Sequence, residues 1–590
     1  MAKKKVEEGA LQTNLLKESE VKILQRYPYA SKIDIEDDDL IISECEKYIT
    51  EVIETKRNEL QLLEKWQEAR DQYNGVVEEK DFPWDDCSNL HIHITSMSVD
   101  ILNTKAQSQM YVSPAMLLKP LPGQTGDTLY EDVLLKEKFL DNKIQEELEV
   151  EERLDNVIQD AINIGTGIVK VTYLRQIDYD ANVSEIYEPV KDDVIQFKID
   201  FEKDKGTPTY NQYLKDLLGT GTEDKPAGIQ IEAWMTSDEV VYNNPILSYV
   251  KLEDLLVRPD ITEIENQDII AENITFTWLE ICNHAEQNYF TNKKVIDNLK
   301  ARYPEEYYKK IYKAREVITY YDYESNNKPK RIVITYLVDE KILVRAITFP
   351  YIHRKPYYIF YYIKRVPGSI YGEGLAERLK YTSKALVSLW NQTVDSGTLR
   401  NAPVFKGVKP TNFDPTVKKW YPGAIWWLEK ITDIETLQVF GQSPEILNII
   451  SRLERYAEWQ TGVTAYATGR ESSLDPNAPA SKAFMLLQES NIRLNKMIRQ
   501  LHKSNKKLYA MVDKLIYQHT KHNKIPYLVM KGDNIEHKSI TKKILGLKVN
   551  YIPHLTDITA NKEEQRDRNL KFGSYLMPFV GKNPEAVREI

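Results

Sequence analysis

Apolar residues recur at helical spacing through the first quarter of the chain. The pattern predicts a helix over residues 39–74, with Gly75 as its C-cap. It predicts a second helix over 90–110 and, after three closely spaced prolines, a third over 128–164. This part of the fold is therefore expected to be α-helical.

Short runs of β-branched and aromatic residues replace the helical pattern after residue 165. Two helices are predicted among them, over 278–289 and 294–302. Because strands and helices do not alternate regularly, the mixture indicates an α+β fold. The predicted strands cover 168–174, 183–187, 228–235, 316–323, 331–338, 342–349 and 357–363.

Two helical patterns then flank a segment rich in aromatic residues, glycine and proline. The first pattern covers residues 375–399 and the second covers 443–461. The second begins with serine, proline and glutamate, which suit the cap, the first turn and the positive end of a helix. Between them, residues 402–441 contain short β-like runs, including adjacent Trp426 and Trp427, which point to opposite sides of a strand.

A loop over 463–480 precedes the longest predicted helix. Arg470 is the one basic residue of the loop. Spacings of three and four between apolar residues predict a helix over 481–520, with asparagine at two positions of its apolar stripe. Its other face is rich in lysine and arginine, which fits either a solvated face or a surface that meets acidic neighbours or DNA phosphates. A strand over 544–551 and a short helix over 562–576 are predicted beyond it.

Composition indicates a large and mostly folded protein. At about 150 residues per domain, 590 residues suggest three or four units. The net charge of −10 argues against a protein whose whole surface grips nucleic acid. Cys45, Cys87 and Cys282 are far apart in sequence, so neither a disulfide framework nor a zinc ribbon is predicted. The basic N-terminus lacks the apolar stretch of a secretory signal, and no apolar run approaches the ~18 residues of a spanning helix.

Sequence motifs of common enzyme classes are missing. The sequence has no GxxxxGK[ST], HExxH or GxSxG motif. Gly372 and Gly374 do not begin a dinucleotide-binding fingerprint, because Glu377 stands where the third glycine belongs. His91 and His93 have no third metal ligand nearby. We therefore predict no enzymatic activity, no cofactor and no metal site.

The order helix, small insert, helix, loop and long helix across residues 367–521 resembles the core of bacteriophage portal proteins. These proteins form the rings through which tailed phages move DNA. The Pro-Trp…Ser-Asn stretch before the helix at 90–110 is similar to one in portal proteins of several phage groups. The resemblance covers the order of elements over most of the chain and is most specific in residues 360–520.

The resemblance implies an α+β fold with a portal-like architecture. It would consist of a helical wing, a β-containing wing region, a two-helix stem, a small α/β clip, a long C-terminal helix and a small crown. The expected parts are a weakly ordered or partner-bound segment over 1–38, the wing over 39–370 (helices in 39–165, strands in 166–370), the first stem helix over 371–401, the clip over 402–441, the second stem helix over 442–462, the tunnel loop over 463–480, the long wing or crown helix and following strand over 481–553, and the crown region over 554–590.

The resemblance also implies a structural role in the virion at the portal vertex, after assembly in the host cytoplasm. The expected assembly is a dodecameric homo-oligomer that serves genome packaging, retention and ejection. The expected partners are double-stranded DNA, the terminase large subunit, head-to-tail adaptor or connector proteins and the major capsid protein, with scaffold protein as a further candidate and no membrane. A duplex that must slide should not be held tightly, so an acidic chain is compatible with this role.

Candidate contact residues follow from the tunnel loop and the clip of the family. The candidates for DNA contact are Arg470, Glu471, Ser472 and Lys482. The candidates for contact with partners or neighbouring subunits through the clip are Lys409, Lys418, Lys419, Trp420, Trp426 and Trp427. Two alternatives stay open: another structural virion protein, such as a collar or internal capsid component, and a metal-dependent nucleic-acid-processing enzyme, which would need a carboxylate cluster.

Overall fold

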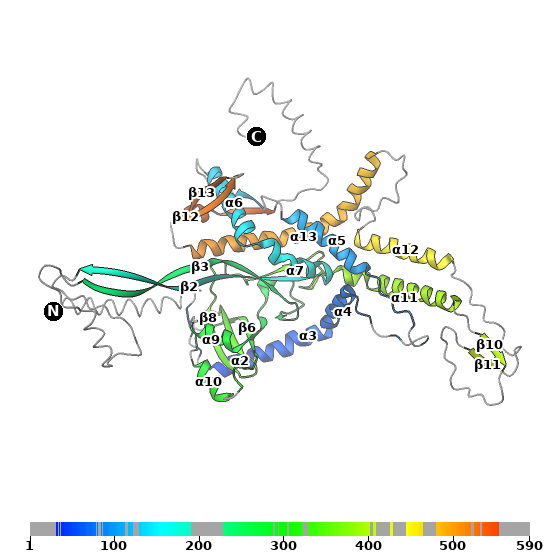
Figure 1. The fold of residues 1–590 in the computed structure, drawn as a ribbon, viewed down its shortest axis with the longest axis horizontal. Helices are drawn as coiled ribbons and strands as arrows, with labels where there is room; N and C mark the ends of the chain where they lie inside the picture. The colour runs from blue at the N-terminus through cyan, green and yellow to red at the C-terminus, as the bar shows by residue number, and fades with distance from the viewer. Residues whose placement is uncertain are drawn as a thin grey trace, which may run out of the picture. The chain divides into compact units, whose positions relative to one another are not determined.

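Helices and strands are mixed in the computed structural model, as the predicted α+β class requires (Figure 1). The chain divides into two compact units, one formed by Met1–Thr172 and Pro245–Ile590 and the other by Tyr173–Asn244. The structure describes residues 31–33, 35, 37–77, 80, 84, 87–111, 116–121, 129–189, 228–286, 289–292, 294–303, 306–322, 329–401, 405–408, 425–428, 444–463, 480–520, 524–531 and 534–553.

The single helix predicted over 39–74 is divided into several helical pieces. The carboxylate of Asp37 caps the first piece by accepting the N–H of Leu40 at 3.1 Å. Gln61 adopts a left-handed conformation (φ 50°) and interrupts the helix, whereas Gly75 (φ 71°) ends it as predicted. The pieces are α2 (Asp38–Tyr48), the π-helical turn η1 (Ile49–Glu54), α3 (Thr55–Glu59) and α4 (Leu62–Asn74).

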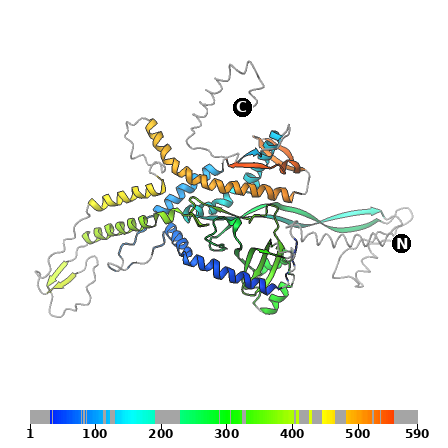
Figure 2. The same cartoon turned by 180° about the vertical axis from the view of Figure 1, so that it is seen from behind.

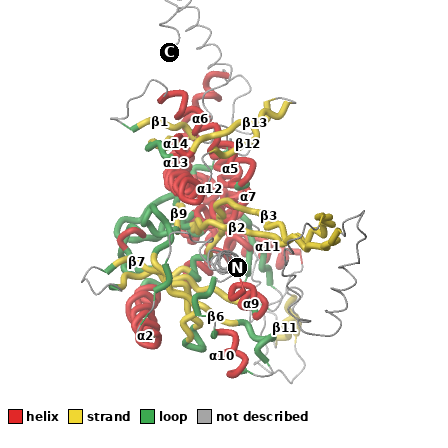
Figure 3. The backbone as a smooth tube through the Cα atoms, turned by 90° about the vertical axis from the view of Figure 1, so that its left-hand side faces the viewer, coloured by secondary structure: helices red, strands yellow, loops and turns green. Residues whose placement is uncertain are grey.

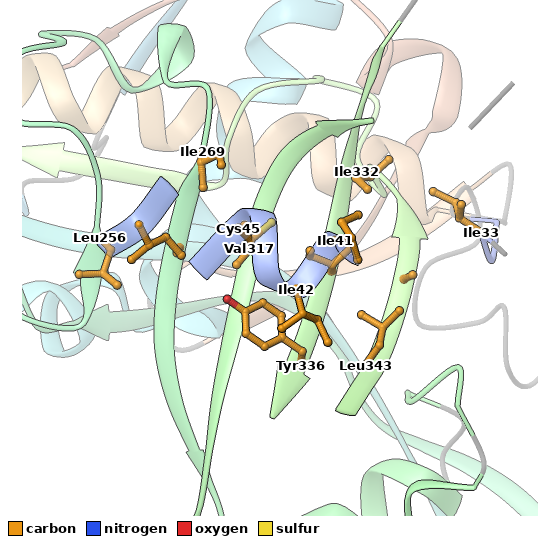
Figure 4. Packing of buried hydrophobic residues seen from close by; sticks show 14 of the residues in the cluster. Ile33, Ile41, Ile42, Cys45, Leu256, Ile269, Val317, Ile332, Tyr336 and Leu343 are labelled. Carbon is orange, nitrogen blue, oxygen red and sulfur yellow. The ribbon is translucent and has the colours of Figure 1, made fainter. Parts of the chain in front are cut away.

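A five-stranded antiparallel sheet, in the order β4-β5-β6-β7-β8, carries a hydrophobic core on each face. Helix α2 packs on one face, where Ile42 and Cys45 lie against Val317 and Tyr336 (Figure 4). Helices α9 and α10 pack on the other face (Figure 3). Strands β4 and β5 were not predicted. The elements are β4 (Leu255–Leu256), β5 (Ile270–Phe276), α9 (Trp278–Glu286), α10 (Val295–Arg302), β6 (Tyr312–Tyr321), β7 (Lys330–Leu337) and β8 (Ile342–Thr348).

A second helical group precedes a three-stranded sheet in the order β3-β2-β9. The helix predicted over 128–164 is broken at Glu149, which has a φ of 46°. Residues 183–187 lie in a strand as predicted, but they continue β2 without a break and do not form a separate strand. The elements are α5 (Ile94–Met110), α6 (Leu129–Asn142), the π-helical turn η2 (Lys143–Glu147), α7 (Val150–Asn163), β2 (Gly167–Pro189), β3 (Gly228–Val250) and β9 (Tyr358–Tyr361).

A buried polar network joins β2 and the start of β9 to the five-stranded sheet. The ammonium of Lys170 lies 2.9 Å from the carboxylate of Glu316, which also accepts the hydroxyl of Tyr357 at 2.6 Å. Burial opposes the charge of Glu316, but Lys170 and Arg345 more than offset this and lower the pKa of Glu316 to about 2. The network therefore replaces apolar packing at this point with paired charges.

The C-terminal half contributes three long helices and several short strands (Figure 2). The strand predicted over 544–551 is partly wrong, because Ile544 belongs to a helical turn and the strand begins at Val549. The helix predicted over 562–576 lies outside the described residues. The elements are α11 (Leu375–Asn401), β10 (Phe405–Val408), β11 (Ile425–Leu428), α12 (Pro444–Thr461), α13 (Ala480–His519), β12 (Lys524–Lys531), β13 (Asn534–Thr541), α14 (Lys542–Leu545) and β14 (Val549–Pro553), which pairs with β1 (Met116–Pro120).

Candidate functional site: the α11–α12 pair and helix α13

Helix α11 begins where two glycine-containing segments pack backbone against backbone. A Cβ atom on Gly374 would lie 2.1 Å from the carbonyl oxygen of Asn163, and one on Gly372 would lie 2.4 Å from that of Gly165. The N–H of Gly372 donates to the hydroxyl of Thr166 at 2.8 Å. Glycine is therefore required at both positions, and the contact fixes the first turn of α11 against the end of α7.

The carboxylate of Glu373 lies at the same junction between two basic side chains. It accepts the guanidinium of Arg378 at 2.8 Å and pairs with Lys364. Partial burial opposes its ionisation, but the hydrogen bonds from Lys364 and Arg378 lower the pKa of Glu373. A negative charge just before the first turn of α11 also suits the positive end of the helix.

Helices α11 and α12 lie side by side as a pair (Figure 1). Buried apolar residues of both helices face inward, including Leu386 of α11 and Ala457 of α12. The hydroxyl of Thr382 donates to the amide oxygen of Gln460 at 3.0 Å. Gly462 (φ 76°) ends α12 where the sequence predicted, and its N–H donates to the carbonyl of Glu458.

Two buried polar residues of α11 hold the segment that precedes α5. The amide oxygen of Asn391 accepts the hydroxyl of Ser88 at 3.0 Å and the N–H of Leu90 at 2.8 Å. The carboxylate of Asp395 accepts the N–H of Ser88 at 2.7 Å. Ser88 lies in the Pro-Trp…Ser-Asn stretch that the sequence singled out, and its hydrogen bonds give that stretch a role in positioning α11.

The α11–α12 pair also exposes large aromatic side chains. Tyr381 of α11 is 78% exposed, and Tyr456 and Trp459 of α12 are 49% and 67% exposed. Tyrosine and tryptophan are enriched at surfaces that contact another protein. This pair is therefore a candidate assembly surface.

Strands β10 and β11 form a parallel pair that places Trp426 opposite Lys406 and Trp427 opposite Gly407. The adjacent tryptophans thus lie in a strand, as predicted, although their side chains lie outside the described part of the chain. Lys482 lies in α13, again without a described side chain. The remaining candidates fall outside the described residues, namely Lys409, Lys418, Lys419, Trp420, Arg470, Glu471 and Ser472.

Helix α13 presents an apolar face and a basic face. Its asparagine at position 505 is fully buried and accepts the hydroxyl of Tyr361 at 2.8 Å. The hydroxyl of Ser504 donates to the carbonyl of Phe360 at 2.7 Å, which fixes α13 on β9. Among the side chains of α13 that the structure describes, the exposed basic residues of the opposite face are Lys496, Arg499, Lys503, Lys506, Lys507 and Lys514.

Sequence reasoning missed the residues that hold α11 in place. Asn391 and Asp395 were unremarkable helix residues, because their partners precede α5, some 300 positions away. Gly372 and Gly374 were noted only for the missing dinucleotide fingerprint, and nothing in the sequence connected them with Gly165. The sequence held no signal for them, because Asn391 and Asp395 lie away from the apolar stripe of α11 that Leu379 and Leu386 mark.

The described residues contain no group of His, Cys, Asp or Glu side chains that could hold a metal ion. Among the helices that the structure describes, none is long and apolar enough to cross a membrane. The region exposes aromatic side chains on α11 and α12 and a row of basic side chains on α13. These groups suit contacts with other macromolecules.

A family model described as phage SU10 portal protein matches residues 135–528, which are 394 of the 590 residues. The matched range begins in α6 and ends in β12, so it contains α11, α12 and α13. No curated protein matches the chain.

Proposed function

The chain belongs to the phage SU10 portal protein family, and on that premise we propose that it forms the ring-shaped DNA channel at the portal vertex of a phage capsid. Portal proteins of bacteriophages are structural virion proteins. The proposed tasks are genome packaging, retention and ejection, and docking of terminase and head-to-tail connector proteins. The proposed oligomer is a dodecamer.

The observation that carries the proposal is the α11–α12 pair. It is fixed at its start by glycine packing, held by Asn391 and Asp395, and exposes Tyr381 and Trp459. A cyclic ring needs one face of each subunit to fit a different face of the next. A fixed pair of helices with exposed aromatic side chains supports a stem that packs against its neighbours around a channel.

The parts of the chain are assigned in this proposal as the family resemblance implies. Residues 39–370 form the wing and 554–590 the crown region. The other parts are the stem helices over 371–401 and 442–462, the clip over 402–441, the tunnel loop over 463–480, and the long helix with its following strand over 481–553.

DNA would meet the tunnel loop. Arg470 is the basic residue of the loop and is proposed to contact phosphates, with Glu471, Ser472 and Lys482 beside it. Contacts directed at phosphates carry no sequence preference and let a duplex slide.

The clip would meet terminase, the adaptor proteins and the neighbouring subunits. Its proposed contact residues are Lys409, Lys418, Lys419, Trp420, Trp426 and Trp427. The wing and crown would face the major capsid protein and scaffold.

Electron microscopy of the purified full-length protein in negative stain tests this function. We expect rings with a central hole wide enough to pass a DNA duplex. Monomers or compact particles without a hole, at every salt and protein concentration tried, would refute the channel.

A further inference from the structure

A pocket of about 320 Å³ lies between helix α13, strand β9 and the turn at Thr262–Glu265. Its volume is at the lower end of the range, about 300–1,000 Å³, that encloses small groups in proteins. Apolar residues contribute to its lining, including Ile359, Phe360 and Met511. The pocket belongs to none of the stem, clip or tunnel-loop assignments above.

Charge is concentrated around this pocket. Six basic side chains and two acidic ones line it, an excess of four positive charges in a chain whose net charge is −10. The basic side chains are Lys355, Arg365, Lys503, Lys506, Lys507 and Lys514. The pocket therefore attracts negatively charged groups.

Two carboxylates of the pocket lining already form ion pairs with three of its six basic side chains. Glu263 pairs with Arg365 at 2.9 Å and with Lys507 at 3.5 Å, and Glu265 pairs with Lys355 at 2.8 Å. In contrast, Lys503, Lys506 and Lys514 are exposed and form no ion pair within the described part of the chain. These three lysines of α13 are therefore able to form ion pairs with carboxylates of another molecule.

A histidine in the pocket lining adds a polar group without a partner. Nδ1 of His353 accepts the N–H of Lys355 at 3.1 Å, so the proton of the neutral ring is on Nε2. The Nε2 atom is buried and has no hydrogen-bond partner among the described residues. Burial, together with Lys514 and Lys355, lowers the pKa of His353 to about 3. A neutral N–H donor beside lysines suits a carboxylate oxygen.

From this geometry we propose that the pocket binds an acidic segment of a second copy of this chain, with a carboxylate on Lys503, Lys506 or Lys514 and an apolar side chain in the pocket. The inference rests on the proposed ring. It locates one of the two complementary surfaces that a closed ring requires.

A second copy offers the required chemistry. Exposed Leu40 follows Asp38 and Asp39, and exposed Tyr130 precedes Glu131. Each combines carboxylates with an apolar side chain, which the basic rim and the apolar lining need together. A DNA duplex fits less well, because its phosphates would meet Glu263 and Glu265 at the rim and leave the apolar lining empty.

Charge reversal in the full-length protein tests the proposal. Lys503→Glu combined with Lys514→Glu changes the pocket, whereas Lys496→Glu combined with Arg499→Glu changes the same basic face of α13 outside it. Mass photometry across a concentration series would measure assembly. We expect the pocket variant to need at least about tenfold more protein for half-assembly than the control variant, since like charges placed together at an interface are strongly unfavourable. Replacement of the same two lysines by glutamine should give a smaller shift.

Each other outcome rejects the proposal. Equal assembly of the pocket and control variants would show that no acidic segment binds there, while rings with a central hole would leave the proposed function intact. If the pocket variant assembled normally but bound a DNA duplex more weakly in a gel-shift assay, the pocket would be assigned to nucleic acid. A wild-type protein that stays monomeric would refute both the pocket and the ring.

Discussion

Lys136 of α6 and Asp513 of α13 form an ion pair at 2.7 Å in which the side chains are 0% and 6% exposed. Lys136 also donates to the carbonyl oxygens of Leu545 and Leu547, and Asp513 accepts the hydroxyl of Tyr551. Burial raises the pKa of the Asp513 carboxyl, and the attraction of Lys136 opposes that rise. The pair thus ties α13 to the segments that surround α6.

Replacement of Lys136 by methionine should destabilise the protein by about 3–5 kcal/mol, because it leaves a buried carboxylate without its counterion. The double variant Lys136→Met/Asp513→Leu should be more stable than the single variant. Urea unfolding would measure both. Lys56→Met, which removes an exposed pair with Glu59 at 3.3 Å, is the control and should cost less than about 1 kcal/mol. Equal costs for Lys136→Met and Lys56→Met would contradict the prediction.

Gly374→Ala should displace the start of α11. The new Cβ atom would lie 2.1 Å from the carbonyl oxygen of Asn163, and a backbone oxygen cannot move aside cheaply. We expect a loss above about 4 kcal/mol, visible as poor soluble yield or as rapid proteolysis near residue 372. Gly368→Ala is the control, because its Cβ meets nothing within 4 Å and only its positive φ of 79° costs stability. A Gly374→Ala protein as resistant as the control would refute the argument.

His353 should make the protein less stable as the pH falls from 7 to 5. Burial, with Lys514 and Lys355 nearby, lowers its pKa to about 3, against 6.5 as its ordinary value. Between these values the unfolded chain binds a proton that the folded chain does not, so stability falls with falling pH. His353→Gln should remove about 2 kcal/mol of the difference in unfolding free energy between pH 7 and pH 5.

Urea unfolding at the two pH values measures this difference, and His93→Gln is the control because the His93 side chain is exposed. If His353→Gln left the pH dependence as steep as in the control, the histidine would not be the responsible group.

Arg470→Glu should weaken DNA retention in assembled particles while rings still form. The substitution replaces the one cation of the tunnel loop with a charge that repels phosphates. Arg470→Lys keeps the charge and should behave as the wild type. Quantification of packaged and retained DNA in particles carrying each variant would test this, and unchanged packaging and retention in Arg470→Glu would remove Arg470 from the proposed contacts.

Helices with strong local signals could be predicted from the sequence. The proline at 444 and the glycine at 462 bound α12, and both act within the element whose ends they set. The breaks at Gln61 and Glu149 could not be predicted, because both are ordinary polar helix residues and nothing in their local sequence marks a positive φ. Local periodicity shows which face of an element is apolar, but not which distant segment holds it.

The polar contacts of the core and of the candidate site show the same limit. Glu316 lies in a strand, and its partners Lys170 and Tyr357 come from two other parts of the chain. Asn391 likewise binds Ser88, which is about 300 residues away. A single sequence has no signal for such pairs, since each residue alone resembles a solvent-facing polar residue. The existence and approximate bounds of α11, α12 and α13 could be predicted from the sequence. The side-chain contacts that hold these helices in place could not.

Trp459→Ala should weaken ring assembly without unfolding the subunit. Trp459 is 67% exposed on α12, and the proposed stem would bury it against a neighbour. Loss of a large aromatic side chain from an interface costs about 2 kcal/mol, which raises the protein concentration needed for half-assembly about 30-fold. Leu279→Ala is the control, because Leu279 is 69% exposed on α9, outside the proposed stem.

Mass photometry would compare the two variants with the wild type, and thermal melting would verify that both remain folded. The Trp459 effect should also persist in high salt, since burial of an aromatic side chain is not screened by ions as the contacts of the α13 pocket are. Assembly of Trp459→Ala at the same concentration as Leu279→Ala would show that this face of α12 does not contact a neighbour. The stem interface would then have to use the exposed side of α11, where Tyr381 lies.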